Sequence, residues 1–371
     1  MDKRNFLKKI ALTGGAILGA SALGGCSGCL SEDKNSSKNV NIHRGKKTRL
    51  RLVTSWPSSF PIMGTGVEYF AEQVKKMSGG SIDIEIYSKN QLVPALAVFD
   101  TASSGQIDIF HSGPYYWKGK NSALSVIGGV PFGMIPSETN SWMRFGGGLE
   151  LWREFYDKYN LYPLLGGNTG IQMGGWFKKE INSLQDLQGL KMRIPGLGGE
   201  VFSKMGVNPI LLPAGEIFTA LERGTIDATE WVSPSLDIKM GFQKVAPFYY
   251  TGWHETGSVL ELTFSKKSWN NLSSEQQSII EIASFDMNNR MTQEFEFENG
   301  KNLELIEKSD VQIKNFPDEV ISKAKIELNN VIDKLSSENP DFKKAWESYS
   351  KFMNQVSKWT NISTKNLLNI R

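Results

Sequence analysis

Cysteine is nearly absent from this chain of 371 residues: there are two, Cys26 and Cys29, and both stand close to the N-terminus. The sequence beyond them can hold no disulfide, no cysteine-ligated metal and no cysteine nucleophile. Two cysteines three residues apart can form a redox motif, but these lie in a glycine- and serine-rich stretch without the strand–helix–strand pattern of a redox domain. The cysteine content therefore argues against both redox and thiol chemistry.

Histidine is almost as scarce, with three residues, and the common catalytic motifs are missing. There is no G-x-S-x-G elbow, no phosphate-binding loop and no H-E-x-x-H zinc motif. His254 and Glu255 begin the zinc motif, but its second histidine is absent. His111 stands alone at the end of a predicted strand, where a histidine is more often structural than a general base. We therefore predict that the protein is not an enzyme.

The chain also lacks an excess of charge of either sign. Forty-two Lys and Arg residues stand against 39 Asp and Glu residues, a formal net charge of +3. This balance predicts neither nucleic-acid binding nor an acidic partner. Forty per cent of the residues are hydrophobic, which is enough for a sizeable core, and the length favours two domains over one.

The N-terminal 25 residues are predicted to be a signal peptide. Basic residues precede an apolar stretch over residues 10–25 that is too short to span a bilayer comfortably, and no later segment is apolar enough to do so. The stretch KRNFLK resembles a twin-arginine export signal with lysine in the first arginine position. We therefore expect an extracytoplasmic, periplasmic protein.

Cys26 is predicted to carry a lipid. The sequence LGGC that ends at this residue resembles a bacterial lipobox, in which the cysteine is acylated and becomes the new N-terminus. The alternative is an ordinary signal peptide with incidental cysteines. Residues 26–47 are polar and rich in Ser, Lys and Asn, so we expect a flexible tether between the lipid and the fold.

Beyond the tether, patterns of alternation and of helical spacing follow each other and predict two α/β lobes. The first lobe covers residues 48–160, with strands at 48–54, 82–87 and 107–110 and helices at 67–77 and 96–102. The pattern restarts near Leu161, and residues 161–258 are predicted to form the second lobe, with strands at 161–165, 174–177, 191–194 and 209–212 and a helix at 216–223. Residues 259–290 are expected to return to the first lobe.

Residues 274–371 are predicted to be almost wholly helical. Ser273 is a suitable N-cap with Gln276 three residues later, and the helix that begins there continues beyond Arg290. Pro317 and Pro340 are expected at the first positions of two further helices. Two lobes with a cleft between them can enclose a small molecule that contacts both lobes only when they close.

Arg193 is the first candidate for a binding residue. In the predicted strand over residues 190–194, Lys191 and Arg193 share the face opposite the apolar residues, and Arg193 lies at the strand end, where clefts form in α/β folds. A guanidinium there can bind a carboxylate through two hydrogen bonds. The alternative is a solvated surface arginine.

Two further segments could contribute oxygen ligands. The glycine-rich stretch over residues 166–176 carries the amides of Asn168 and Gln172, and an amide oxygen is a neutral ligand for a hard cation. Glu230 offers a carboxylate, and the neighbouring Trp231 offers a large flat aromatic ring that could line a binding site. The alternatives are an ordinary turn in the first case and a surface glutamate beside a core tryptophan in the second.

Taken together, these segments resemble a known family from about Thr48 to the C-terminal helices. The sequence is similar to the substrate-binding subunits of tripartite ATP-independent periplasmic (TRAP) transporters, closest to the subgroup that binds 2-oxo acids together with a cation. The segments that carry the resemblance are residues 55–57, 113–117, 130–134, 167–177, 193–199, 215–217, 220–224, 226–231 and 252–255.

The resemblance implies a role for each matching residue. Arg193 corresponds to the arginine that binds the ligand carboxylate, and Gln172 to a residue that contacts both ligand and cation. Glu230, Glu255 and Trp231, the last through its backbone carbonyl, correspond to the other positions of the cation site. Tyr115 and Tyr116 correspond to cleft residues of the opposite lobe, and Asn168 is a further candidate for ligand contact.

The resemblance also implies the architecture and the partners. We expect a two-lobed fold of the periplasmic-binding-protein type with a long helix that bridges the lobes, and a homodimer in which a C-terminal helix is exchanged. The expected partners are a small organic acid, a 2-oxo acid such as pyruvate or a 2-hydroxy acid, and two integral membrane transporter subunits. A sensory lipoprotein with the same clamp, or an extracytoplasmic enzyme, is the alternative.

Charge counting supports a bound cation independently. Glu230, Glu255 and one ligand carboxylate carry three negative charges against the single positive charge of Arg193. A dry cleft cannot hold the uncompensated charge cheaply, so sodium or calcium is expected beside the ligand. Ligand affinity should then fall when the cation is removed.

Overall fold

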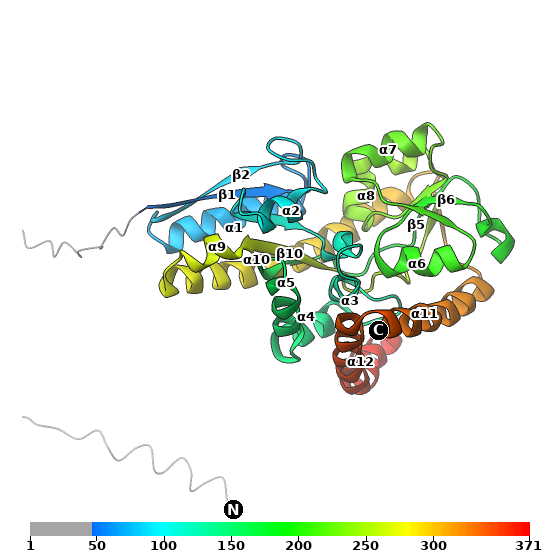
Figure 1. Cartoon of the computed structure of the whole chain (residues 1–371). Helices are drawn as coiled ribbons and strands as arrows, with labels where there is room; N and C mark the ends of the chain where they lie inside the picture. The colour runs from blue at the N-terminus through cyan, green and yellow to red at the C-terminus, as the bar shows by residue number, and fades with distance from the viewer. Residues whose placement is uncertain (1–46) are drawn as a thin grey trace, which may run out of the picture. The chain divides into compact units, whose positions relative to one another are not determined.

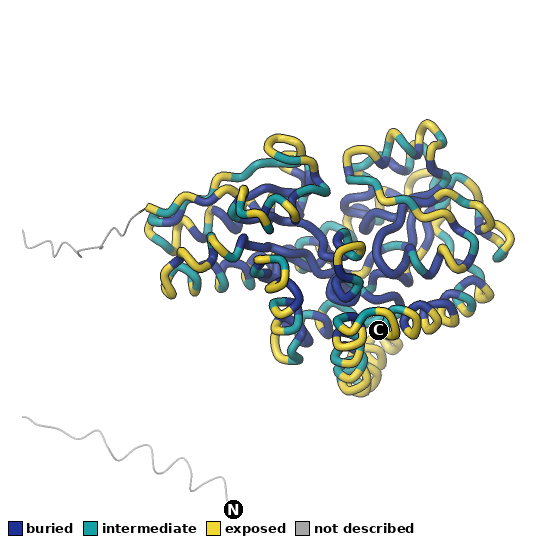
Figure 2. The backbone as a smooth tube through the Cα atoms, viewed as in Figure 1, coloured by how far each residue is buried: buried dark blue, intermediate teal, exposed yellow. Residues whose placement is uncertain are grey.

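A computed structural model describes residues 47–371 of the protein (Figure 1). The expected signal peptide at residues 1–25, the lipidation site Cys26 and all but the last residue of the tether at 26–47 lie outside the described residues. Figure 2 shows buried residues in the middle of each lobe and many exposed residues on the helices near the C-terminus.

The first sheet has the strand order β2-β1-β3-β10-β4. Strand β1 (Thr48–Thr54) pairs in parallel with β2 (Ile82–Tyr87) and with β3 (Ile109–Ser112). Strand β10 (Val259–Ser265) runs antiparallel between β3 and β4 (Leu161–Asn168). The sheet is therefore completed by two strands that come from much later in the chain.

Strand β4 differs from its expected place. The restart of the pattern near Leu161 predicted a strand of the second lobe, but β4 pairs with β10 at the edge of the first sheet. All of its residues except Tyr162 are buried, so it has no alternation that would assign it to one sheet or the other. Its place is decided by long-range pairing with β10.

Helices of the first lobe pack around this sheet. Helix α1 contacts β2, and α5 contacts β4. The helices of this part are α1 (Met63–Met77), α2 (Val98–Ser103), α3 (Ala123–Gly128), α4 (Pro136–Phe145), α5 (Gly148–Asp157) and α9 (Lys266–Asn270).

The second sheet is mixed, with the strand order β11-β9-β5-β8-β6-β7. Its central strand β5 is antiparallel to both neighbours, whereas β6 is parallel to β7 and to β8. The strands are β5 (Gly175–Phe177), β6 (Lys191–Arg193), β7 (Asn208–Ile210), β8 (Ala228–Thr229), β9 (Phe248–Tyr250) and β11 (Gln312–Lys314), and the helices are α6 (Gly196–Lys204), α7 (Ala214–Glu222) and α8 (Pro234–Met240).

Helix α10 (Ser274–Glu307) has 34 residues and connects the two lobes. It packs against β4 and α1 of the first lobe and against α8 of the second. Its start agrees with the sequence prediction, because the Ser273 side chain accepts a hydrogen bond from the backbone N–H of Gln276 and the Gln276 side chain reaches back to the backbone of Ser273. The predicted long helix is thereby confirmed.

The remaining helices are α11 (Asp318–Glu338), α12 (Pro340–Thr360) and α13 (Asn366–Ile370). Pro340 occupies the first position of α12 as predicted, whereas Pro317 lies one residue before α11 as its N-cap. Helix α11 packs on α6 of the second lobe, and α12 packs on α3 of the first. None of the helices within residues 47–371 combines the length and the hydropathy needed to span a bilayer.

Candidate functional site

The predicted site residues lie at the ends of strands and in the loops where the two lobes meet. Arg193 ends β6, and Tyr115 and Tyr116 belong to a short 3-10 turn, Pro114–Trp117, that follows β3. The other residues are Asn168 at the end of β4, Gln172 between β4 and β5, Glu230 and Trp231 between β8 and α8, and Glu255 between β9 and β10.

Arg193 is 1% exposed, so the alternative of a solvated surface arginine is excluded. Its Nη1 donates to the carboxylate and, at 3.1 Å, to the backbone carbonyl of Glu230. Nη2 donates to the hydroxyl of Tyr116 at 3.2 Å, Nε donates to the carbonyl of Leu212 at 3.4 Å, and the guanidinium lies 5.1 Å from the ring centre of Trp231. A guanidinium has five N–H groups, so one on Nη2 has no acceptor within residues 47–371.

Glu230 is as deeply buried as Arg193, so it is not the surface glutamate of the alternative reading. One carboxylate oxygen receives the Arg193 hydrogen bond, and the other lies 3.1 Å from Nε2 of His254. From the sequence, His254 was considered only as the start of an incomplete zinc motif. Its position directly before Glu255, in a segment that carries the family resemblance, was the available signal.

Glu255 is also buried and accepts a hydrogen bond of 2.7 Å from the hydroxyl of Ser258. Burial, followed by the negative charge of Glu230, raises the pKa of Glu255 to about 7. The raised pKa reflects the cost of holding a second carboxylate in this buried place. Ser258 was not singled out from the sequence, where only its spacing of three residues from Glu255 would have suggested it.

Backbone hydrogen bonds tie these distant segments to one another. The N–H of Gln172 donates to the carbonyl of Glu255 at 3.0 Å, and the N–H of Met173 donates to the carbonyl of Val232 at 2.8 Å. The N–H of Glu230 donates to the carbonyl of Arg193 at 3.0 Å. Four stretches of chain that carry candidate residues are therefore brought together by main-chain contacts.

Gln172 is the residue that best fits a cation. Its Nε2 donates to the hydroxyl of Thr169 at 2.9 Å, but its buried Oε1 has no hydrogen-bond donor among the described residues. A buried acceptor without a partner costs free energy, which a cation at this oxygen would remove. The backbone links place this amide beside the segments of Glu255 and Trp231.

The oxygens that the candidate residues could offer to a cation are hard ones. The carboxylates of Glu230 and Glu255, the amide oxygen of Gln172 and the carbonyl of Trp231 are the ligand types of sodium and calcium. In the described part of the chain, no three His, Cys, Asp or Glu side chains are grouped in a way that could hold a metal ion. The set therefore fits a cation that accepts neutral oxygens, rather than a zinc site.

Asn168 directly precedes Thr169, whose hydroxyl accepts from the Gln172 side chain. Its Oδ1 accepts from the backbone N–H of Gly170 at 2.9 Å, and its Nδ2 donates to Oδ1 of Asn140 at 3.3 Å. The bond to Gly170 lies within the turn after β4, and a contact between Asn168 and a ligand stays a prediction.

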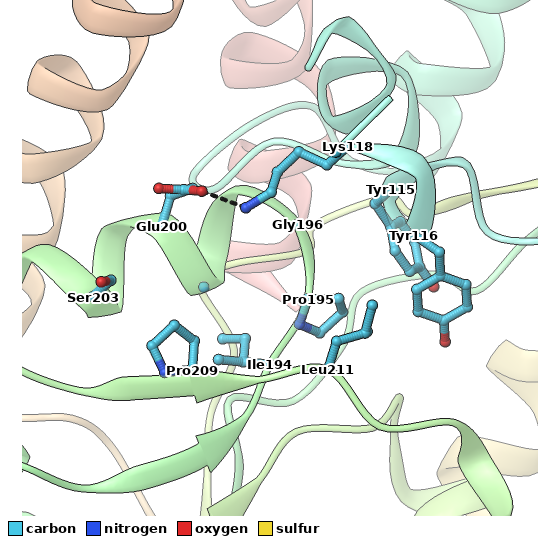
Figure 3. Close-up of a pocket in the computed structure, with 12 residues that line it drawn as sticks. Tyr115, Tyr116, Lys118, Ile194, Pro195, Gly196, Glu200, Ser203, Pro209 and Leu211 are labelled. Carbon is cyan, nitrogen blue, oxygen red and sulfur yellow. Dashed lines mark hydrogen bonds and ion pairs between the residues drawn. The ribbon is translucent and has the colours of Figure 1, made fainter. Parts of the chain in front are cut away.

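A cavity of about 350 Å³ lies between residues of the two lobes, and Figure 3 shows the side chains that line it. Tyr115 and Tyr116 line it from the first lobe, and Tyr116 is also the residue that contacts Arg193. Ile194, Pro195, Gly196 and Leu211 line it from the second lobe. An ion pair between Lys118 of the first lobe and Glu200 of the second spans the cavity.

His111 has the structural role predicted for it. Its Nδ1 accepts from the indole of Trp56 at 2.7 Å, and its Nε2 lies 2.8 Å from the carbonyl of Gly166. An indole can only donate, so Nε2 carries the hydrogen and donates to the carbonyl. Burial lowers the pKa of His111 to about 4, which keeps the ring neutral.

Comparison with known proteins shows which family the chain belongs to. The sequence pattern of the family described as bacterial extracellular solute-binding protein, family 7, matches residues 52–339. The chain belongs to this family. Family 7 proteins bind solutes outside the cytoplasm and are not enzymes, so the predicted class of protein is confirmed.

Three relatives of this family 7 protein are informative. A monocarboxylate 2-oxoacid-binding periplasmic protein of Nostoc sp. is 39% identical over 318 residues, which cover 85% of this chain and 86% of the relative. A TRAP periplasmic solute-binding protein from Colwellia psychrerythraea, solved with calcium and pyruvate, is 44% identical with a TM-score of 0.86 and covers 88% of this chain and 100% of that one. Its counterpart from Pseudoalteromonas atlantica, solved with sodium and pyruvate, is 42% identical with a TM-score of 0.86, over 87% and 99% of the two chains.

These similarities confirm the predicted two-lobed α/β fold with its long helix and C-terminal helices. They also confirm the resemblance to TRAP solute-binding proteins of the 2-oxo acid subgroup.

Proposed function

We propose that this family 7 protein captures a small 2-oxo monocarboxylate such as pyruvate together with sodium or calcium, and delivers it to the two membrane subunits of a TRAP transporter. The observation that carries the proposal is the buried Arg193, which keeps one N–H without an acceptor among residues 47–371. It donates to Tyr116, a residue that lines the interlobe cavity. The bound pyruvate and cations of the relatives from Colwellia and Pseudoalteromonas support the same ligand class. A 2-hydroxy acid is the second ligand to test.

The carboxylate of the ligand would be held by the guanidinium of Arg193. A planar guanidinium can donate two hydrogen bonds to one carboxylate, which gives direction as well as affinity. In this arrangement the ligand competes with Glu230 for Arg193. A cation beside Glu230 and Glu255 would offset the charge that Arg193 no longer compensates.

Closure would follow from contacts that involve both lobes. Tyr116 comes from the first lobe and Arg193 from the second, and their hydrogen bond spans the cleft. A ligand held between these residues favours the closed arrangement, because only that arrangement offers both contacts.

Isothermal titration of the purified protein tests the proposal. Pyruvate, longer 2-oxo acids, lactate and a dicarboxylate are titrated with sodium, with calcium and with neither cation. We expect one 2-oxo or 2-hydroxy acid to bind only when a cation is present. Binding of equal strength without a cation, or no binding across the panel, would contradict the proposal.

Arg193→Lys provides the matched variant for this titration. It keeps the positive charge that compensates the buried Glu230 but loses the planar set of donors. We expect the Kd of the ligand to rise about 10- to 100-fold, as for a lost hydrogen bond to a charged group. Arg223→Ala removes an exposed arginine of the same lobe and should leave the Kd unchanged.

We further propose that Cys26 carries the lipid that holds the protein at the membrane. The lipobox resemblance supports this assignment, and a tether raises the local concentration of the protein at its membrane partner. Mass spectrometry of the mature protein should find acyl groups on Cys26. Cys26→Ala should release the protein from the membrane fraction, whereas Cys29→Ala should not.

We also propose a homodimer formed through the C-terminal helices. Trp359, Ile362 and Ile370 are 66%, 71% and 75% exposed and follow helical spacing, which leaves an apolar stripe on the surface. Light scattering at micromolar concentration should give a dimer for the wild type. Trp359→Glu with Ile370→Glu should give a folded monomer, and a monomeric wild type would contradict the proposal.

A further inference from the structure

Two fully buried carboxylates lie outside the candidate site, one in each lobe. Asp237 and Glu261 are both 0% exposed, and neither has a Lys, Arg or His within salt-bridge distance among residues 47–371. A buried carboxylate without a cation is costly unless hydrogen-bond donors surround it. Each of these two accepts from one tryptophan, one tyrosine and one further donor.

Glu261 supports the turn that carries the cleft tyrosines. It lies on β10, and its Oε1 accepts a hydrogen bond of 2.5 Å from the indole of Trp117. Its Oε2 accepts from the hydroxyls of Tyr156 at 2.8 Å and Thr263 at 2.7 Å. Trp117 is the last residue of the 3-10 turn and directly follows Tyr116, the residue that contacts Arg193.

Asp237 supports the loop that carries Glu230 and Trp231. Its Oδ1 accepts from the backbone N–H of Val232 at 3.0 Å, and its Oδ2 accepts from the indole of Trp176 at 3.0 Å and from the hydroxyl of Tyr249 at 2.8 Å. The carbonyl of Val232 in turn accepts from the N–H of Met173, the neighbour of Gln172. Asp237 thus holds Val232, the residue whose carbonyl joins this loop to the segment of Gln172.

We propose that Asp237 and Glu261 are positioning residues, one for each half of the site. Asp237 sets the Glu230–Trp231 segment for the cation, and Glu261 sets the Tyr115–Tyr116 turn for the organic acid. The inference rests on the proposed function, since it assigns residues that act on the ligand and the cation through others. Burial raises the pKa of both carboxylates to about 7, which agrees with the cost of placing them there.

The donors around each carboxylate allow a test that separates geometry from charge. At Asp237, both oxygens face N–H groups that cannot reverse, those of Val232 and Trp176. An asparagine has one acceptor oxygen, so its NH₂ group must face one of the two. Trp176 lies on a central strand and its ring stacks on that of Tyr249, with 4.1 Å between the ring centres. In Asp237→Asn we therefore expect the loop that carries Val232 to move, and Trp176 to stay in place.

At Glu261 only one oxygen faces a donor that cannot reverse, the indole of Trp117. The other oxygen faces two hydroxyls, and a hydroxyl can accept as well as donate. A glutamine can therefore accept from Trp117 and donate to Tyr156 and Thr263. The neutral isostere should preserve positioning at Glu261 but not at Asp237.

The experiment for Asp237 is calcium titration of the full protein by calorimetry. Asp237→Asn should weaken calcium binding about 10-fold or more, as for residues that orient metal ligands. Trp176→Phe alone should leave the calcium Kd within about threefold of the wild type. In the double variant the fixed indole donor is gone, so the asparagine oxygen can turn to Val232 and calcium affinity should recover.

Recovery in the double variant is the decisive outcome. If the double variant binds calcium as weakly as Asp237→Asn, the lost charge and not the position of the loop explains the effect, and the inference is overturned. Hydrogen exchange at the Val232 amide gives a second readout, which should be faster in Asp237→Asn and restored in the double variant. An unchanged calcium Kd in Asp237→Asn also overturns the inference.

The experiment for Glu261 is pyruvate titration at saturating calcium. Glu261→Met removes every acceptor and should weaken pyruvate binding about 10-fold, as for a lost buried hydrogen bond. Glu261→Gln should restore the wild-type Kd, and neither variant should change the calcium Kd. Should Glu261→Met fail to fold, Trp117→Phe breaks the same contact from the turn and should weaken pyruvate binding alone.

These outcomes are distinguishable from failure of the proposed function. A wild type that binds neither calcium nor pyruvate contradicts the function itself. A wild type that binds both, with Glu261→Gln as weak as Glu261→Met or with Trp117→Phe unchanged, contradicts only the positioning role.

Discussion

At the scale of single residues, each buried charged side chain of the candidate site has its own set of hydrogen-bond partners. Arg193 uses four of its five N–H groups on Glu230, Tyr116 and Leu212, and so keeps a defined direction without a ligand carboxylate. Glu255 has the hydroxyl of Ser258, and its raised pKa reflects its burial and the nearby charge of Glu230. Binding of a charged ligand beside these buried groups therefore depends on electrostatics, because a ligand charge placed there needs a partner of opposite charge.

The pH dependence of folding offers a test at the residue scale. Burial raises the pKa of Glu261 to about 7, whereas the ordinary value of 4.5 applies to the unfolded chain. Between these values the folded chain binds more protons, so stability falls as pH rises from 4.5 to 7, by up to about 1.4 kcal/mol per pH unit for this group. Urea unfolding should give a shallower decline for Glu261→Gln, and parallel curves would contradict the raised pKa.

At the scale of elements, the long helix α10 lies close to glycines of α1 and β4. A Cβ added at Gly66 of α1 would lie 2.6 Å from the terminal methyl of Met291 on α10, and one added at Gly167 of β4 would meet the sulfur of the same methionine. Gly167 also has φ of +143°, a conformation that other residues rarely adopt. One side chain of the helix, Met291, thus lies close to both elements.

These two glycines form a matched pair for mutation. Gly66→Ala should change stability by less than about 1 kcal/mol, because the flexible methyl of Met291 can move and alanine favours the helix. Gly167→Ala should destabilise the protein by more than about 1 kcal/mol, since backbone strain adds to the clash. Thermal unfolding of both variants checks this, and equal melting temperatures would contradict it.

At the scale of the whole molecule, a few side-chain contacts cross between the lobes. Tyr116 contacts Arg193, Trp56 lies edge-on to Trp231 at 6.3 Å, and Lys118 pairs with Glu200 beside the cavity. Opening the cleft must break these contacts, so they influence how fast a ligand leaves.

Ligand release should therefore depend on the Lys118–Glu200 pair. Both side chains are about one-third exposed, so the pair contributes at most about 1 kcal/mol, or roughly a fivefold change in rate. Stopped-flow measurement should find release faster in Lys118→Ala at low salt, with the difference lost in high salt. Lys120→Ala, which breaks a pair within the first lobe, is the control and should leave release unchanged.

Several features were predictable because they depend on residues close together in the chain. The Ser273–Gln276 capping box marked the start of α10, and Pro340 marked that of α12. The scarcity of cysteine argued against thiol and redox chemistry. The segments that carry the family resemblance, those around Arg193 and Glu230 among them, pointed to a solute-binding family.

Other features arose only from contacts between distant parts of the chain. Strand β4 lies in the first sheet because it pairs with β10, and no local pattern records that pairing. Asp237 and Glu261 looked like ordinary acidic residues until the fold surrounded them with indoles and hydroxyls.

The sequence by itself determined the class of protein and the starts of α10 and α12, and it offered candidate side chains for a carboxylate and a cation. The tertiary structure decided which of them meet, through hydrogen bonds such as that from Gln172 to the carbonyl of Glu255. The physical reason is that residue type and local spacing are written in the chain, whereas burial and long-range backbone pairing exist only once it has folded.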